Sequence, residues 1–379
     1  YRTQDRLTET IESNQSINTF DNESDTDFSL ETNRVWAQAI IDKWSNIAKS
    51  GGYHVHSVIG GDEVKGEKQI VVIDKSQFHE NIEVGSYTKV GKEQLNKALD
   101  IAKKDADGWS RKTSLQRYEI LANVANEFKK ARADLIGVAA AEVGKVFSET
   151  DVEVSEAIDF LYFYPHSYKQ IEDLDSVTLK PKGVALVISP WNFPIAIPVG
   201  GIAAALATGN TVILKASSSS ILCGYRLCQC FWDAGVSKKT LQYVIADGKD
   251  VSSELVANED VAFVIFTGSE DTAYNMLDTR PNLHISAETG GKNATIVTTL
   301  ADKDQAIKNV VASAFNNSGQ KCSATSLLIL EEELYKDKVF METLVDAAKS
   351  LEVGSVWDLH NKIGTLSSLP NAKLKKALD

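Results

Sequence analysis

The chain opens with a polar, acidic stretch, and apolar positions at regular spacing begin only after it. Residues 1–33 are rich in acidic and small polar side chains, which is typical of a linker or an extended arm. Apolar residues then recur every three or four positions over 36–47, which predicts one amphipathic helix. Two short strands are expected at 53–59 and 68–73. They would form an edge hairpin or pair with a neighbouring chain.

From residue 92 to residue 168 the apolar and alanine positions keep a helical period, and such stripes usually form core. After Pro181 the pattern changes to short β-prone runs that alternate with helical stretches. This alternation predicts an α/β fold with a parallel, doubly wound sheet, and a domain boundary near 288–292. The expected strands are 183–188, 211–214, 241–245, 261–266, 294–297 and 326–330, and the expected helices are 199–207, 221–233, 251–258, 305–315 and 334–351.

Composition excludes several classes of protein. The formal net charge of −12 provides no basic surface for nucleic acid or an anionic membrane. No apolar run approaches the roughly 18 residues of a membrane span, and no secretory signal is present. Four cysteines in 379 residues indicate a reducing compartment without disulfides, so a cytoplasmic location is expected. Cys223, Cys228 and Cys230 match no zinc spacing, so we expect them to be packing residues and expect no metal site.

Two features suit a bound anion or nucleotide. The strand at 261–266 ends in Thr267, Gly268 and Ser269, directly before a helical pattern. The free N–H groups and positive end of such a helix attract an anion, although a plain N-cap without a ligand is the alternative. Lys215 ends another strand, at the sheet edge where α/β proteins bind ligands, or it is simply solvated. The common G-x-G-x-x-G fingerprint is absent.

A rigid amide lies at the end of the first strand of this series. Asn192 stands between Pro190 and Pro194, which restrict the backbone on both sides. A side-chain amide held in this way can stabilise a developing oxyanion. A rigid turn without a catalytic role explains the same residues.

Cys322 and Glu288 are the candidate nucleophile and base. A thiol must ionise to attack, and either Lys321 or a helix beginning at Ser323 would lower the pKa of Cys322. Glu288 precedes a glycine pair that would leave its carboxylate mobile. An inert cysteine and an ordinary glycine turn are the alternatives for the two motifs taken singly.

Taken in order, the motifs W-N-F-P, a strand ending in lysine, F-T-G-S, E-T-G-G-K-N and G-Q-K-C resemble the aldehyde dehydrogenase family over about 92–379. The resemblance implies an arm with small strands (1–75), a Rossmann-type NAD(P)-binding domain (76–288) and a second α/β catalytic domain (289–379). It implies that Cys322 is the nucleophile, that Glu288 is the base for the hydrolytic water, and that Asn192 belongs to the oxyanion hole. The implied cofactor residues are Trp191, Lys215, Ser218, Thr267, Gly268 and Ser269.

A narrower resemblance rests on the acidic linker and on the sequences 286–293 and 319–324. These are similar to the L-glutamate γ-semialdehyde (1-pyrroline-5-carboxylate) dehydrogenase half of fused proline-utilisation proteins. That resemblance implies oxidation of the semialdehyde to L-glutamate through a cysteine thiohemiacetal and thioester, the second step of proline catabolism. It implies Glu156 for the substrate ammonium, Phe193 for its aliphatic part and Ser323 for its carboxylate. A proline dehydrogenase domain in the same full-length chain and a homo-oligomer are further expectations.

Three departures from the family pattern keep alternatives open. Ser218 stands where the family usually has a glutamate that binds ribose hydroxyls, so NADP becomes possible beside NAD. The later E-x-F-G-P motif does not occur before Asp379, nor do the C-terminal substrate loop and oligomerisation strand. The chain is therefore expected to be truncated at both ends. The alternatives are a dehydrogenase for another aldehyde, such as succinate semialdehyde, and a non-catalytic dinucleotide-binding fragment.

Overall fold

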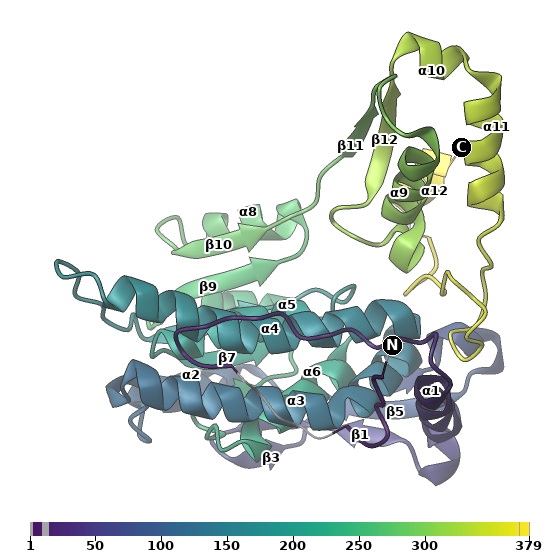
Figure 1. Cartoon of the computed structure of the whole chain (residues 1–379). Helices are drawn as coiled ribbons and strands as arrows, with labels where there is room; N and C mark the ends of the chain where they lie inside the picture. Colours follow the sequence, from purple (N-terminus) through teal and green to yellow (C-terminus); the bar gives the residue numbers. More distant parts are fainter. Residues whose placement is uncertain (1–2, 10–14, 371, 379) are drawn as a thin grey trace.

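The computed structural model describes residues 3–9, 15–370 and 372–378. It contains a large α/β unit and a smaller unit built on strands β11 and β12 (Figure 1). Within the described residues, none of the helices combines the length and the apolar character that crossing a bilayer requires.

The larger unit is organised around a seven-stranded sheet with the strand order β10-β9-β6-β7-β8-β2-β3. Strands β6 to β10 run parallel, whereas β2 pairs antiparallel with both β8 and β3. The residues of β6 are buried on both faces, as parallel strands between two helical layers require. The strands are β2 (Ser57–Ile59), β3 (Asp62–Val64), β6 (Val184–Ile188), β7 (Thr211–Lys215), β8 (Leu241–Tyr243), β9 (Val261–Thr267) and β10 (Ile285–Glu288).

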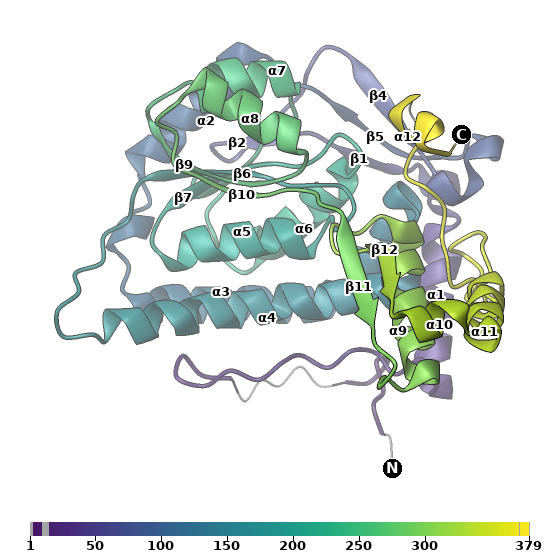
Figure 2. The ribbon, with the colours of Figure 1, turned by 90° about the horizontal axis from the view of Figure 1, so that it is seen from above.

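Helices cover both faces of this sheet, so the predicted doubly wound arrangement is confirmed (Figure 2). On one face, α5 and α6 pack on the strands, and α3 and α4 form a second layer outside them. On the other face lie α2, α7 and α8 with the π-helical turn η4. The helices are α2 (Lys92–Lys104), α3 (Ser114–Val143), α4 (Phe147–Glu172), α5 (Ala196–Ala207), α6 (Ile221–Asp233), α7 (Gly248–Val251), η4 (Ser252–Val256) and α8 (Glu270–Thr279).

The N-terminal region pairs differently from the expected hairpin. The predicted strand 53–59 breaks at His56 into β1, which joins a small sheet in the order β1-β5-β4, and β2, which joins the main sheet. The predicted strand 68–73 pairs with β5 instead of with 53–59, so the hairpin prediction is wrong. The elements are α1 (Glu31–Trp44), η1 (Ile47–Ser50), β1 (Tyr53–Val55), β4 (Gln69–Ile73), η2 (Lys75–Glu80), β5 (Glu83–Thr88) and η3 (Trp109–Arg111).

Hydrogen bonds to side chains of α4 hold the acidic N-terminal arm against the outer helical layer. The buried Asp151 carboxylate accepts hydrogen bonds from the Thr26 backbone and hydroxyl at 2.6 and 2.5 Å. It also pairs with Arg132 of α3 at 2.9 Å. The arm is therefore an ordered part of this unit where it is described, because its polar groups satisfy buried groups of the helices.

The smaller unit is a β-α-β crossover with further helices. Its two strands run parallel, and their inner face packs on α9. The single helix expected at 334–351 is two helices, because the Asp337 carboxylate accepts from the N–H groups of Val339 and Phe340 and begins a new helix there. The elements are β11 (Asn293–Val297), α9 (Lys303–Phe315), η5 (Asn316–Gly319), β12 (Thr325–Leu330), α10 (Glu332–Lys336), α11 (Lys338–Lys349) and α12 (Ala372–Leu378).

Candidate active site

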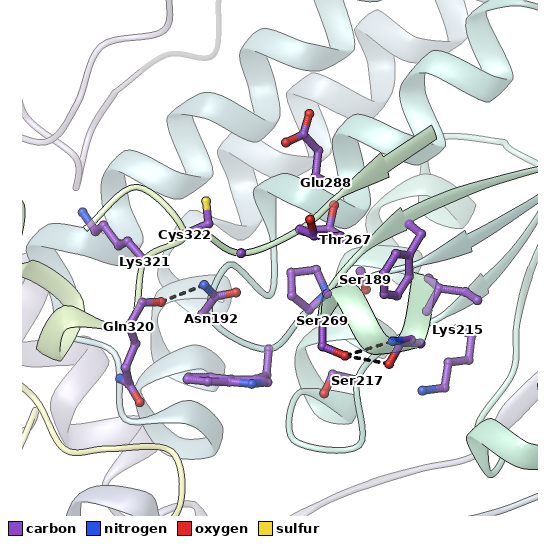
Figure 3. Close-up of a pocket in the computed structure, with 18 of the residues that line it drawn as sticks. Ser189, Asn192, Lys215, Ser217, Thr267, Ser269, Glu288, Gln320, Lys321 and Cys322 are labelled. Atoms are coloured by element: carbon purple, nitrogen blue, oxygen red, sulfur yellow. Dashed lines mark hydrogen bonds between the residues drawn. The ribbon is translucent and has the colours of Figure 1, made fainter. Parts of the chain in front are cut away.

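A cavity of about 460 Å³ opens where the carboxyl ends of β6, β7, β9 and β10 meet the loop before β12 (Figure 3). This is the sheet edge at which α/β proteins bind ligands. Most of the residues singled out in the sequence line it together. They are Trp191, Asn192, Lys215, Thr267, Gly268, Ser269, Glu288 and Cys322.

Cys322 is exposed on this cavity, in a turn between η5 and β12. The helix expected to begin at Ser323 does not exist, because the chain turns at Cys322 and Ser323 and continues into β12. No helix N-terminus therefore faces the thiol from its own segment. The cation beside it, Lys321, forms an ion pair with Glu149 at 2.6 Å.

The other three cysteines are buried in the core of α6. Burial raises the pKa of Cys223 and Cys228 well above the ordinary range, and it raises the pKa of Cys230 to about 12. These thiols stay protonated at neutral pH, so Cys322 is the cysteine with access to a ligand.

The loop before Cys322 has an unusual backbone. Asn317, Ser318 and Gly319 take consecutive left-handed conformations, with φ of 52°, 59° and 69°. Such angles are unfavourable for a serine and persist only where surrounding contacts hold them. The Ser318 hydroxyl donates to the Gly364 carbonyl at 2.9 Å, and the Gln320 side-chain oxygen accepts from the Ser367 N–H at 3.1 Å.

Glu288 is the last residue of β10, an edge strand that the sequence pattern did not indicate. Its carbonyl accepts from the Gly268 N–H at 3.1 Å, which ties the end of β10 to the start of α8. The carboxylate itself is exposed. In Figure 3 the side chains of Glu288 and Cys322 point in the same direction.

Asn192 links the two units across the cavity. Its side-chain nitrogen donates to the Gln320 carbonyl at 2.7 Å, which uses one of its two amide hydrogens. Its backbone carbonyl accepts from the Asn317 amide at 3.2 Å and from the Lys145 ammonium at 3.1 Å. The amide is therefore fixed beside the nucleophile loop with one hydrogen still available to a ligand.

At this sheet edge, the N-termini of α5 and α6 are already occupied by buried acids. Glu153 accepts from the N–H groups of Ile195 and Ala196 at the start of α5, at 2.6 and 3.0 Å. Glu142 accepts from Leu222 and Cys223 at the start of α6, at 2.9 and 2.8 Å. Because these side-chain oxygens already accept from the N–H groups of both helix starts, neither start is free to bind the anion of a ligand.

The start of α8 differs, because its cap is the neutral Ser269 hydroxyl, which accepts from the Thr272 N–H at 3.3 Å, and because it faces the cavity through Gly268 and Ser269. The exposed acids of its first turn, Glu270 and Asp271, do not line the cavity. A Cβ on Gly268 would stand 2.6 Å from the ring of Phe266, so only glycine keeps this backbone close to the cavity. The residues present thus fit a pyrophosphate at the start of α8.

The part of the cavity near the ends of β6 and β7 has two polar groups suited to a ligand. Lys215 ends β7, and burial, followed by the nearby Lys89 charge, lowers its pKa. The buried Ser189 hydroxyl has no hydrogen-bond partner within the described residues. Ser217 lines the cavity, whereas Ser218 is exposed and does not line it, so the cofactor role of Ser218 stays a prediction.

The three expected substrate residues lie outside the cavity lining. Glu156 is exposed on α4, and desolvation by its neighbours, followed by the Glu153 carboxylate, raises its pKa. Phe193 stacks under Lys145, whose ammonium lies 4.1 Å from the ring centroid. Ser323 is exposed next to Cys322. Their substrate roles also stay predictions.

Sequence reasoning missed the buried charges that support the site, namely Glu142, Lys145 and Glu153. In the sequence they look like ordinary polar positions of two helices, and no spacing marks them as buried. In the described parts of the chain, no cluster of three or more His, Cys, Asp and Glu side chains could hold a metal ion.

Comparison with known proteins identifies the family to which this chain belongs. The model of the "Aldehyde dehydrogenase family" matches residues 64–377. A 1-pyrroline-5-carboxylate dehydrogenase of Geobacillus sp. (strain WCH70) is 33% identical over 357 residues, which cover 89% of this chain and 68% of that protein. The protein of the same name from Geobacillus kaustophilus is 34% identical, over 87% of this chain and 66% of that protein.

Two solved structures extend the comparison. Proline utilization A from Bdellovibrio bacteriovorus superposes with a TM-score of 0.87 at 28% identity, over 94% of this chain and 38% of that chain. A 1-pyrroline-5-carboxylate dehydrogenase from Thermus with bound NAD gives 0.85 at 30% identity, over 92% of this chain and 70% of that chain. The chain spans about two thirds of the length of the curated relatives it matches. It belongs to the aldehyde dehydrogenase family.

Proposed function

We propose that this chain carries the site that oxidises L-glutamate γ-semialdehyde to L-glutamate with NAD⁺. The observation that carries the proposal is the meeting of Cys322, Glu288 and Asn192 on one cavity with the start of α8. The names of the relatives, which are 1-pyrroline-5-carboxylate dehydrogenases, support this aldehyde over others such as succinate semialdehyde.

In the first step, the Cys322 thiolate adds to the aldehyde carbon and forms a thiohemiacetal. The free amide hydrogen of Asn192 and the Cys322 N–H would stabilise the charge that develops on the carbonyl oxygen. Removing one such donor typically lowers kcat about 100- to 1,000-fold.

NAD⁺, when bound, supplies the hydride acceptor that turns the thiohemiacetal into a thioester. Gly268 and Ser269 would hold its pyrophosphate at the helix start, and Lys215 would hold its adenosine ribose. The Glu288 carboxylate then takes a proton from water, and the resulting hydroxide displaces the Cys322 thiolate to release the acid. The balance is aldehyde, NAD⁺ and water to acid, NADH and a proton.

The covalent acyl adduct on Cys322 can be measured, and it provides the test of the proposed function. The protein is incubated with the semialdehyde and NAD⁺, and the Cys322 peptide is analysed by mass spectrometry while NADH is followed by absorbance. Glu288→Gln should accumulate the acyl adduct on Cys322, because general-base assistance is worth about 100- to 10,000-fold. Cys322→Ser should abolish both the adduct and NADH, whereas Cys223→Ser, in the core, should leave the adduct unchanged. Undiminished NADH formation by Cys322→Ser would reject the proposal and favour a non-catalytic fragment.

We further propose that the natural full-length chain joins this unit to a proline dehydrogenase domain. The likeness to a proline utilization protein supports this arrangement. The mass of the natural gene product tests it, since a chain no longer than the curated relatives would contradict the fusion.

A further inference from the structure

Lys145 and Glu153 form the most completely buried ion pair described in the chain, and neither lines the cavity. Their charged atoms are 2.7 Å apart, and each side chain is 1% exposed. Lys145 lies between α3 and α4, and Glu153 lies in α4. A buried pair of this kind gains little net stability over well-packed apolar residues, so its position calls for another explanation.

The pair contacts the loop between β6 and α5 at Asn192 itself and at the end of the loop. The Lys145 ammonium donates to the Asn192 carbonyl at 3.1 Å and stacks on Phe193. The second Glu153 oxygen accepts from the N–H groups of Ile195 and Ala196, at 2.6 and 3.0 Å. One buried salt bridge thus holds the loop at Asn192 and at the start of α5.

We propose that Lys145 and Glu153 are positioning residues that hold the Asn192 amide at the oxyanion site beside Cys322. This inference rests on the proposed function. Without Lys145, the Asn192 carbonyl keeps only the 3.2 Å bond from Asn317, and the peptide plane can rotate. Rotation moves the side-chain amide relative to the sulfur. A displacement of about 1 Å at a catalytic group can lower the rate about 100-fold.

Two reactions of the Cys322 thiol distinguish a loss of Asn192 positioning from a general loss of folding. Acylation of Cys322 by p-nitrophenyl acetate passes through a tetrahedral oxyanion: the C–S bond forms when the thiolate adds to the ester carbonyl, and p-nitrophenolate leaves when this oxyanion collapses. Alkylation by iodoacetamide displaces iodide directly and develops no oxyanion. Neither reaction needs the cofactor, so both can be measured on this chain as it is.

The variants are Lys145→Met and the double variant Lys145→Met/Glu153→Gln. The double variant removes the unpaired buried charge, while the glutamine oxygen can still accept from Ile195 and Ala196. We expect both variants to acylate about 10- to 100-fold more slowly than the wild type and to alkylate at the wild-type rate. Lys145→Arg, which keeps a cationic donor, should recover part of the acylation rate. Arg132→Met, which breaks another buried pair whose partners Asp151, Ser155 and Glu23 lie outside the loop, should leave the ratio of the two rates unchanged.

The outcomes are distinct. If the wild type acylates no faster than Cys322→Ser, the proposed function fails before the positioning role is tested. If the wild type acylates and the folded double variant keeps the same ratio of rates, the positioning role is wrong. A parallel fall of acylation and alkylation would likewise show that the pair serves the fold alone.

Discussion

Loss of the Arg132 guanidinium should destabilise the larger unit strongly, because this group joins two buried partners and the partly buried Glu23. It pairs with Asp151 at 2.9 Å and donates to the Ser155 hydroxyl at 3.1 Å. It also reaches Glu23 of the arm at 3.1 Å. The side chains of Arg132 and Asp151 are 3% and 1% exposed, so water cannot replace a lost partner.

Arg132→Met keeps the aliphatic stem and removes the charge, which leaves the Asp151 carboxylate with only the two hydrogen bonds from Thr26. Breaking one side of a buried pair typically costs about 3–5 kcal/mol. Lys103→Met is the matched control: the Lys103–Asp260 pair is shorter, at 2.7 Å, but its side chains are 57% and 40% exposed. Such a surface pair contributes about 0–1 kcal/mol.

Urea unfolding followed by tryptophan fluorescence measures both variants, and Trp36 lies on the same small cavity as Arg132. With a slope of about 3 kcal/mol per molar urea, the midpoint should fall by about 1 to 1.7 M for Arg132→Met. It should fall by no more than about 0.3 M for Lys103→Met. Equal midpoint shifts for the two variants would refute the reasoning, because burial would then have no influence on the free energy of unfolding that an ion pair contributes.

Three further predictions concern the cofactor and acid stability. Ser218→Glu should raise KM for NADP about 10-fold over KM for NAD in initial-rate assays, since a carboxylate repels the 2′-phosphate. Gly268→Ala should weaken NAD binding in a fluorescence titration, whereas Gly248→Ala, whose Cβ meets no atom within 4 Å, should not. The hydrogen bond from Lys92 lowers the pKa of Glu254 from 4.5 to about 2. Its stabilisation is therefore present above pH 4.5 and is lost toward pH 2, so Glu254→Gln should flatten urea midpoints measured across that range.

The sequence predicted helices and strands correctly where their buried face produces a regular pattern of apolar residues. Helix α6 begins and ends at the predicted residues, because its apolar face is continuous from Ile221 to Phe231. Strand β10 was missed because it is an edge strand whose residues are largely exposed, so it shows no apolar run. Strand 53–59 was predicted as one element because nothing in its composition marks the break at His56.

The same distinction holds for the site. Cys322, Glu288 and Asn192 stand in short motifs with glycine or proline neighbours, so local chemistry singled them out. Glu153 has no such neighbour, and the glycine before Lys145 is what an ordinary helix end requires, so only the packing of α3 and α4 on α5 reveals that the two side chains are buried. Contacts between segments far apart in the chain cannot be inferred from periodicity, which reports only the local exposure of one element.

The loop that carries Cys322 also fastens the smaller unit to the larger one. Gln320 and Asn317 bond to Asn192 across the junction, and Lys321 pairs with Glu149 at 2.6 Å. Docking of the two units and assembly of the catalytic groups are therefore the same event. Mild denaturant should abolish the chemistry while circular dichroism still reports intact helices, because the bonds across the junction involve partly exposed groups, whereas the cores of the two units are buried.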